Sequence, residues 1–441
     1  MVGDPTLAHG KRNSDHGPAA CGQAHRCLRR LLARPARRMA GDLAVLRVLM
    51  SLFNQTGRGT YWRALSLGKE LTARGHQVAL LSVSPKRRWG FDTHLVGGVT
   101  VVETPDLLPG SLRSGWDPFD VLARIAWLER HPCDLVHAFE NRPVALLPAL
   151  YARRRRDVPL VQDWCDWFGR GGSVEERPNP AQRALLRPVE TFFEEVPRAW
   201  ADGITVINST LHRKALALGV QPERILQLPN GANVSEIYPQ DRWQARRRLG
   251  LPLEAAIVGY TGAIFPRDAQ LMAKAFDQLH SMNPDTRLLL IGYCNVPVQE
   301  LVREPSAVLR TGPLSFDQLV DHLAACDIGW LPLTNSGANR GRSPLKLNDF
   351  MAAGRPVVST SVGDLGGFFQ QYEVGLLAKD DPKVLADVIL GLLEDPERIR
   401  AMGERARRLA ENEFSWGRVA DRLEAFYESC IEARPHRRSR G

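Results

Sequence analysis

A lysine and an aspartate, Lys346 and Asp349, stand three residues apart at the start of a segment that has the pattern of a helix. Ser343 suits the capping position, Pro344 the first helical position, and Gly354 the left-handed end. Backbone amides at a helix N-terminus carry partial positive charge, and Lys346 adds a full charge in the same turn. This combination suits a ligand with both phosphates and sugar hydroxyls. Taken alone, the pattern is equally typical of an amphipathic helix with solvated charges.

Alternating strands and helices must position that segment. Residues 46–53 have the pattern of a strand, 60–74 of a helix and 78–83 of a strand, with a glycine-bearing loop after the first strand. The same order begins again within residues 256–280. Units of strand, loop and helix are typical of Rossmann-like domains with parallel sheets. We therefore predict an α/β protein with two Rossmann-like domains.

Carboxylates follow two predicted strands of the first unit. Glu140 follows the strand at residues 134–139, and Asp163 and Asp166 follow a strand at residues 160–161, among tryptophans and glycines. Ligands of α/β folds bind at the carboxyl ends of parallel strands. Aromatic faces and carboxylates suit sugar rings and hydroxyls, so we interpret these three acids as candidate catalytic groups on the acceptor side. A core aromatic cluster with structural aspartates is the alternative.

The segment from Ser343 to Gly363 resembles the donor-binding helix of the retaining GT-B glycosyltransferases, the family-four-like enzymes of the glycosyl transferases group 1 type. The match continues through Gly375-Leu376-Leu377 and Phe414-Ser415-Trp416. In all it spans roughly residues 44 to 430. The resemblance implies a GT-B fold, in which two Rossmann-like domains face a cleft. It also implies transfer of a sugar from a nucleotide-diphosphate sugar to an acceptor, with retention of anomeric configuration.

The resemblance further implies which residues bind the donor. A carboxylate at Asp349 would bind the ribose, and Lys346 with the helix amides would bind the diphosphate. Glycine loops at the start of each domain would lie close to the phosphates, and Thr311 would line the base pocket. The full expected donor set is Gly57, Arg58, Gly59, Gly262, Arg267, Thr311, Arg342, Ser343, Leu345, Lys346 and Asp349.

Two departures from the family pattern concern a histidine and an arginine. Relatives often carry a second histidine near the reacting sugar, where this chain has Phe139. They often carry an arginine that clamps the diphosphate, where this chain has Ala263. Arg267, a few residues further on, is the candidate substitute for that arginine.

A third departure concerns a pair of carboxylates that the family spaces with seven residues between them. Asp349 fills the second position, but the first is Gly341. Amides of the glycine-rich loop, Glu140 or Asp364 are the candidate substitutes. The departures leave a non-catalytic relative, acting as a nucleotide-sugar-binding, glycan-binding or scaffold subunit, as the main alternative. A nucleotide-sugar epimerase on the same fold is a further rival.

Charge is concentrated at the two ends of the chain. The formal net charge is +9, of which residues 1–40 carry +6 and residues 433–441 carry +4, so the remainder carries −1. A near-neutral body argues against a nucleic-acid-binding fold.

We expect the chain to divide into five parts. These are a disordered basic tail at residues 1–42, an acceptor domain at 43–236, a donor domain at 237–410, a helix at 411–432 that packs back on the first domain, and a basic tail at 433–441.

The seven cysteines form no close pairs of the metal-binding type, so we predict neither a metal site nor disulfides. Free cysteines of this kind are typical of a protein in the reducing cytosol. No apolar run is long enough to span a membrane. The basic tails and the arginines at 153–156 are typical of solvated charge in the first place, and a peripheral contact at the inner face of the membrane is the second interpretation. The expected partners are a nucleotide-sugar donor, as substrate rather than cofactor, and a glycan, lipid-linked or small-molecule acceptor. The oligomeric state stays open.

Overall fold

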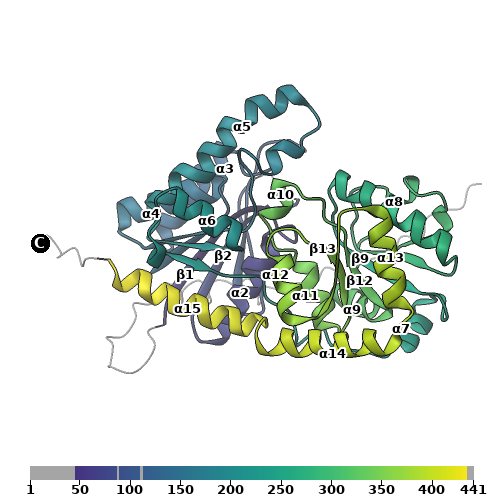
Figure 1. Cartoon of the computed structure of the whole chain (residues 1–441). Helices are drawn as coiled ribbons and strands as arrows, with labels where there is room; N and C mark the ends of the chain where they lie inside the picture. Colours follow the sequence, from purple (N-terminus) through teal and green to yellow (C-terminus); the bar gives the residue numbers. More distant parts are fainter. Residues whose placement is uncertain (1–44, 87–88, 110–112, 435–441) are drawn as a thin grey trace, which may run out of the picture.

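The computed structural model describes residues 45–86, 89–109 and 113–434 (Figure 1). It contains two α/β domains that lie side by side, each built on its own sheet. The predicted α/β class with two Rossmann-like domains is confirmed. The expected basic tail at 1–42, and all but the first two residues of the one at 433–441, lie outside the described residues.

The N-terminal domain contains an eight-stranded sheet in the order β3-β4-β2-β1-β5-β6-β7-β8. Every neighbouring pair is parallel except β3 with β4. The strands are β1 (Arg47–Gln55), β2 (Gln77–Val83), β3 (Asp92–Val96), β4 (Val99–Thr104), β5 (Leu135–Phe139), β6 (Leu160–Trp164), β7 (Gly203–Val206) and β8 (Ile225–Gln227). The helices are α2 (Tyr61–Ala73), α3 (Pro118–Arg130), α4 (Pro143–Arg156), α5 (Pro180–Glu195) and α6 (Ser209–Ala217). All five residues of β5 and of β6 are buried, as expected for strands covered on both faces.

The C-terminal domain contains a six-stranded sheet in the order β11-β10-β9-β12-β13-β14, and all of its pairs are parallel. The strands are β9 (Ile257–Thr261), β10 (Arg287–Ile291), β11 (Val308–Arg310), β12 (Ile328–Leu331), β13 (Val357–Thr360) and β14 (Gly375–Ala378). The helices are α7 (Arg242–Leu249), α8 (Pro266–Met282), α9 (Phe316–Ala325), α10 (Gly337–Arg340), α11 (Leu345–Ala352), α12 (Leu365–Tyr372) and α13 (Pro382–Leu393).

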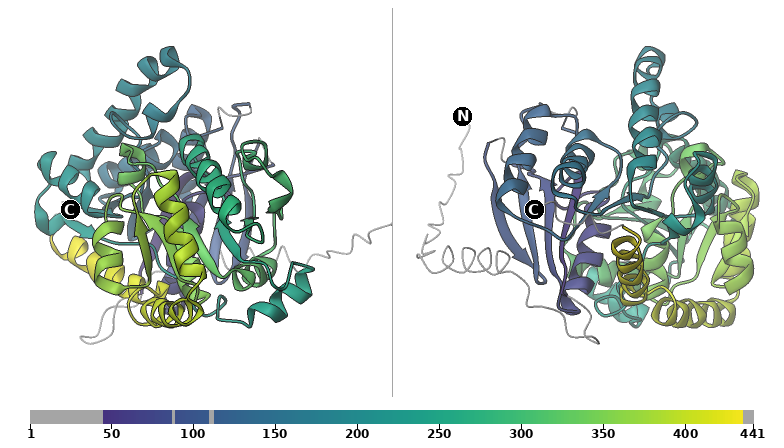
Figure 2. Two further views of the ribbon diagram at one scale, coloured as in Figure 1. Left: turned by 45° about the vertical axis from the view of Figure 1, so that its right-hand side comes forward. Right: turned by 90° about the vertical axis from the view of Figure 1, so that its left-hand side faces the viewer.

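The last two helices, α14 (Pro396–Asn412) and α15 (Trp416–Glu432), link the domains. The first contacts α11 in the C-terminal domain, whereas α15 packs against α2 in the N-terminal domain. Between them, Ala232 donates its N–H to the Phe414 carbonyl (2.5 Å) and accepts from the Trp416 N–H (3.2 Å). Leu423 and Tyr427 then join the apolar core beneath β1. Helices α14 and α15 therefore hold the N-terminal domain against the C-terminal domain (Figure 2).

The segment before β7 differs from its prediction. The sequence predicts a flexible loop at residues 169–180 and a helix from Pro188. The structure instead contains a short 3-10 turn (Ser173–Glu176) and a helix that already begins at Pro180, with Pro188 inside it. Asn179 caps this helix by accepting from the first-turn amides, which explains the earlier start.

The helix that carries Lys346 also begins later than predicted. Pro344 occupies the N-cap position of α11, with extended ψ of 119°, and no side chain caps the helix. Ser343 instead offers its carbonyl to the Asn230 amide of the N-terminal domain, at 2.9 Å. The start of α11 is thus held by the other domain rather than by its own cap.

Among the described residues, none of the helices combines the length and apolar character that a membrane span requires.

Asp163 is part of a buried ion pair, and the structure does not support a catalytic role for it. Its oxygens accept from Arg63 of α2 at 3.0 and 3.1 Å and from the Thr205 hydroxyl at 2.6 Å. Arg63 also donates to the carbonyls of Leu228 (2.9 Å) and Pro229 (3.0 Å). Burial alone would raise the pKa of Asp163, but the Arg63 guanidinium outweighs it and holds this pKa below its usual range. Asp163 therefore stabilises the domain and cannot reach a sugar.

Asp163→Asn should lower the free energy of unfolding at neutral pH by roughly 3–5 kcal/mol, because it leaves the Arg63 charge buried and unpaired. Since the pKa of Asp163 is depressed, its stabilisation is present at neutral pH and is lost as the pH falls through that pKa. Urea unfolding at several pH values measures the difference, which should shrink in acid. Asp387→Asn, which removes an exposed pair with Lys383, should cost no more than about 1 kcal/mol. Equal losses in both variants would contradict this assignment.

Candidate active site

The two domains meet where α10 lies against the loop after β6. A Cβ atom at Gly337 would stand 1.7 Å from the Gly171 carbonyl oxygen, and one at Gly341 would stand 2.3 Å from the Trp167 Cβ. Both distances are far shorter than any allowed contact, so only glycine permits this approach. The loop that carries Asp166 is thereby held against the donor domain.

Asparagine side chains of the N-terminal domain hold the chain that leads into α11. Asn208 donates to the carbonyls of Arg340 (3.0 Å) and Arg342 (3.3 Å). In return, Asn348 of α11 donates to the carbonyls of Asn230 (2.8 Å) and Gly231 (3.1 Å). The sequence patterns did not single out Asn208 or Asn348, because their partners lie more than a hundred residues away.

Asp364, one of the candidate substitutes for the carboxylate that is absent at Gly341, forms hydrogen bonds across the domain contact. Its two oxygens accept from the Ser209 N–H (2.8 Å) and the Ser209 hydroxyl (2.5 Å) at the start of α6. The structure therefore does not bring Asp364 to the donor as a free carboxylate.

Lys346 lies on the first turn of α11 with a half-buried side chain. Its ammonium donates to the Tyr260 hydroxyl (2.5 Å) and the Ala263 carbonyl (3.0 Å), and it lies 3.9 Å from the centroid of the Tyr260 ring. No acidic side chain of the described residues lies within 4 Å of it. Burial and the neighbouring Arg342 lower the pKa of Lys346 to about 7. An anion bound beside it would therefore favour the charged form.

Asp349 lies one turn further along α11 and is also half-buried. Its carboxylate has no hydrogen-bond partner within the part of the chain that the structure describes. Burial raises the pKa of Asp349 to about 7, against the opposing effect of the Lys346 charge. A hydroxyl donor would satisfy this carboxylate and favour its ionised form.

Arg342 is fixed at the entrance to α11 by a buried acid. Asp268 is 1% exposed and accepts from Arg342 (3.3 Å), from Asn339 (2.9 Å) and from the Thr334 amide (2.8 Å). The guanidinium also stacks over the Phe265 ring, 4.1 Å from its centroid. Arg342 therefore holds a fixed positive charge beside Lys346, whose pKa it lowers. The sequence did not identify Asp268 as its anchor.

The other residues expected to bind the donor are exposed, packed in a core or already hydrogen-bonded within the protein. Gly57, Arg58 and Gly59 form an exposed turn after β1, and Leu345 packs against the core of the N-terminal domain. Gly262 has φ +73° and open space where a Cβ would be. The Thr311 hydroxyl accepts from the Gly292 N–H (2.9 Å) and donates to the Gly312 carbonyl (2.9 Å), so it is engaged within its own loop. Arg267 is exposed and pairs with Glu176 of the other domain at 3.4 Å.

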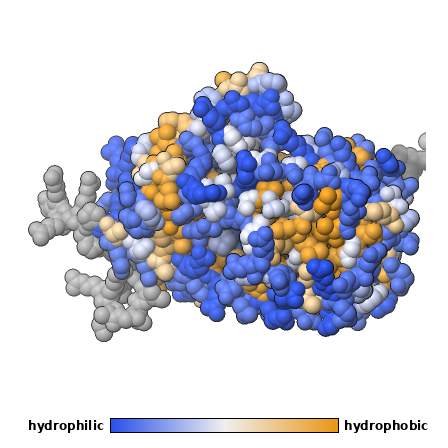
Figure 3. Space-filling view, viewed as in Figure 1, coloured by the Kyte–Doolittle hydropathy of each residue, from blue (hydrophilic) through white to orange (hydrophobic). Residues whose placement is uncertain are grey.

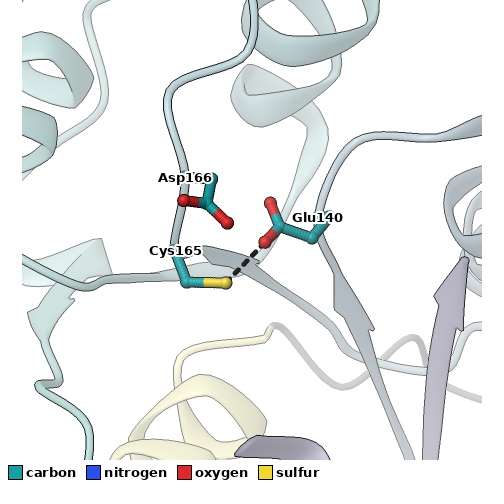
Figure 4. Close-up of side chains that lie close together, drawn as sticks. All are labelled: Glu140, Cys165 and Asp166. Atoms are coloured by element: carbon teal, nitrogen blue, oxygen red, sulfur yellow. Dashed lines mark hydrogen bonds between the residues drawn. The ribbon is translucent and has the colours of Figure 1, made fainter. Parts of the chain in front are cut away.

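Glu140, Cys165 and Asp166 form a cluster on the N-terminal side (Figure 4). One potential ligand atom from each residue lies within 4.8 Å of the other two. Glu140 is fully buried and has φ +70°, a strained conformation for a non-glycine residue. Its Oε1 accepts from the Cys165 thiol (2.5 Å) and the Thr60 hydroxyl (3.1 Å), while its buried Oε2 has no partner among the described residues.

The two carboxyl groups of this cluster have different proton affinities. Burial and the charge of Asp166 raise the pKa of Glu140 well above its usual range. Burial raises the pKa of Asp166 to about 6, partly opposed by Arg342. Two neighbouring carboxyl groups with raised pKa values suit proton transfer and hydrogen bonding to a sugar. Burial also raises the pKa of Cys165 well above the thiol range, which opposes the thiolate that a metal site would need.

His137, by contrast, is a satisfied core residue. Its ring nitrogens pair with the Tyr427 hydroxyl (2.7 Å) and the Thr205 hydroxyl (3.3 Å), and burial lowers its pKa to about 3. The candidate site therefore contains Lys346, Arg342 and Asp349 in the C-terminal domain, with Glu140 and Asp166 across the interface.

Two family models match the chain. A glycosyl transferase 4-like domain matches residues 58–231, and a glycosyl transferases group 1 domain matches residues 255–395. The D-inositol 3-phosphate glycosyltransferase 1 of Catenulispora acidiphila is 27% identical over 416 residues, which cover 88% of this chain and 96% of that protein. The GDP-mannose-dependent monoacylated α-(1-6)-phosphatidylinositol monomannoside mannosyltransferase of Corynebacterium glutamicum is 28% identical over 57% of this chain and 66% of its own length.

Solved structures share the fold. Sucrose-phosphate synthase from Thermosynechococcus elongatus superimposes with a TM-score of 0.71 at 19% identity, covering 88% of this chain and 99% of that one. HepE of Anabaena, solved in complex with UDP-glucose, has a TM-score of 0.65 at 17% identity, covering 87% and 100%. The matched models account for most of both domains, and the chain belongs to the group 1 glycosyltransferases, with their two-domain GT-B fold.

Proposed function

We propose that this protein transfers a sugar from a nucleotide-diphosphate sugar to an acceptor hydroxyl, with retention of anomeric configuration. The proposal rests on the first two turns of α11, where the Lys346 cation and the Asp349 carboxylate share one face without pairing with each other. Lys346 has only a hydroxyl and a carbonyl as partners, and Asp349 has none among the described residues. Such unpaired groups suit a ligand that supplies both a diphosphate and ribose hydroxyls.

In this reaction the nucleoside diphosphate leaves while negative charge builds on its oxygens. Lys346, Arg342 and the free amides of α11 would bind that charge, and they are held in place before the reaction begins. Asp268 positions Arg342, and the Tyr260 ring positions Lys346. The mechanism needs no protein nucleophile if the acceptor hydroxyl attacks the anomeric carbon of the donor sugar from the same face as the departing diphosphate.

We further propose that Asp166 supplies the carboxylate that relatives carry at the position of Gly341. Gly341 lies against Trp167, so the main chain next to Asp166 occupies the space that a side chain at 341 would need. Burial raises the pKa of Asp166, and the charge of Arg342, one residue after Gly341, partly opposes this rise. Glu140 lies beside Asp166 and has a raised pKa, and in its protonated form it would donate a hydrogen bond to the sugar or acceptor.

The acceptor would bind on the N-terminal side of the interface, near Glu140 and Asp166. The two relatives described above act, by their names, on inositol-containing compounds. Inositol phosphates and phosphatidylinositol mannosides are therefore the first acceptors to screen, within the wider class of glycan, lipid-linked and small-molecule acceptors. The anomeric coupling constant of the isolated product, measured by NMR, tests retention.

Donor affinity should be greatest near pH 7 and fall on both sides by up to about tenfold per pH unit. Below pH 7 a proton neutralises Asp349, and above it Lys346 loses the charge that binds the diphosphate. Calorimetric titration of UDP-glucose and GDP-mannose between pH 5.5 and 8.5 measures this profile. Asp349→Asn should abolish the acidic decline and keep the alkaline one.

Asp317→Asn, on the exposed start of α9, should leave the pH profile unchanged. If neither donor binds the wild-type chain at any pH, the donor site is wrongly assigned. If a donor binds but no acceptor is modified, the result favours a non-catalytic binding or scaffold subunit over a glycosyltransferase.

Asp166→Asn should slow release of the nucleoside diphosphate by about a hundredfold or more, with donor affinity little changed. Gly341→Ala should also slow it, because the added methyl group displaces Trp167 and the loop beside it. Gly391→Ala, at a position with open space on α13, serves as the matched control and should retain wild-type rates. Wild-type turnover in Asp166→Asn would refute the proposed replacement.

A further inference from the structure

Helix α5 and the 3-10 turn that follows it (Val196–Trp200) project from the N-terminal domain (Figures 1 and 2). All of their fully exposed residues are apolar except Gln182. The largest exposed side chains are Leu185, Val189, Phe192, Val196 and Trp200, which are 71%, 38%, 50%, 42% and 37% exposed. The first four recur at helical spacing and so share one face. Apolar residues are visible at the outer end of this projection in Figure 3.

Three charged residues of the same segment face the domain core: Glu190, Glu194 and Arg198 are each no more than 1% exposed. Arg183, Arg187 and Glu195 are partly buried, and Arg187 pairs with Glu175. Glu194 accepts from the Trp164 indole (3.0 Å) and the Phe168 amide (2.7 Å), and Arg198 donates to the Asp163 carbonyl (3.0 Å). An ordinary surface helix buries its apolar face and exposes its charges. This segment buries three of its six charged side chains and exposes a row of apolar ones, so its outer face suits an apolar partner.

A basic hollow of about 540 Å³ opens where the 3-10 turn ends. Ala199 of that turn lines it, together with Arg153, Arg154, Arg224 and Arg434 and the acids Asp157 and Asp202. The acids pair with Arg153 and Arg434. The Arg154 guanidinium has no acidic partner within 4 Å among the described residues and lies 5.5 Å from the centroid of the exposed Trp200 ring. The apolar face therefore runs directly into a site with excess positive charge.

We propose that this face, from Leu185 to Trp200 with the adjoining arginines, docks on an anionic phospholipid bilayer. The apolar side chains would enter the boundary of the acyl chains, Trp200 would lie at the headgroup level, and Arg154 and Arg224 would bind headgroup phosphates. The charges favour this occupant over a second copy of the chain. A symmetric dimer through the same face would bring like-charged arginines toward one another. Binding of a bilayer by this face does not depend on the sugar transfer proposed above.

Flotation of the full chain with lipid vesicles tests the proposal. The wild-type chain should bind vesicles that contain phosphatidylglycerol and bind phosphatidylcholine vesicles much less. The double variant Leu185→Ser/Phe192→Ser should lose at least about tenfold in affinity for the anionic vesicles. The matched control Leu301→Ser/Phe316→Ser alters two comparably exposed apolar residues of the donor domain and should bind like the wild type. Arg154→Ala should weaken binding and reduce its dependence on salt.

Three results would overturn the proposal. The first is that the wild-type chain binds no vesicles. The second is that Leu185→Ser/Phe192→Ser binds as tightly as the control, which would assign any attachment to another part of the chain. The third is a wild-type dimer in sedimentation velocity that Leu185→Ser/Phe192→Ser converts to a monomer, because the face would then be a contact between copies. Circular dichroism of both double variants verifies that they fold.

Discussion

Contact between two glycine-rich loops sets how closely the domains of this protein approach. Gly337 and Gly341 leave no room for a side chain against the loop at residues 167–171. Because this loop also follows β6, its position fixes Asp166 at the domain interface. Asparagine side chains on both sides then bind main-chain carbonyls of the opposite domain, so α11 is oriented by both domains rather than by its own cap. A side chain at 341 would displace the loop and loosen the rest of the site.

Glu140 and Lys346 differ from Asp163, His137 and Asp364 in the partners of their polar atoms. Asp163, His137 and Asp364 have their hydrogen-bonding capacity filled by protein groups, and each stabilises a strand, a core or a domain contact. Glu140 has a buried oxygen without a partner, and Lys346 has no acidic partner, in the described part of the chain. Leaving such groups unsatisfied costs folding free energy. Groups retained at that cost, at an interface between two domains, are those that a ligand would satisfy.

Local patterns predicted most of the fold, including the order of strands and helices, the two domains and the helix with Lys346 and Asp349. They did not separate Asp163 from Asp166, which are three residues apart, because the partner that distinguishes them, Arg63, is 100 residues away in sequence. The start of α5 was misplaced because Pro188 suggested a helix boundary, whereas the Asn179 cap begins the helix earlier. The proposed replacement of a carboxylate at Gly341 by Asp166 could not be predicted, since it depends on the packing of a distant loop.

A crystal structure with a bound nucleotide sugar, UDP-glucose or GDP-mannose, tests this account most directly. The account predicts the diphosphate within hydrogen-bonding distance of Lys346 and the first amides of α11, and the ribose on Asp349. It also predicts a hydroxyl of the donor sugar on Asp166, from the opposite domain. A diphosphate bound elsewhere, or a donor sugar that contacts only the glycine-rich loop while Asp166 stays apart from it, would contradict the claim that the missing carboxylate is supplied across the interface.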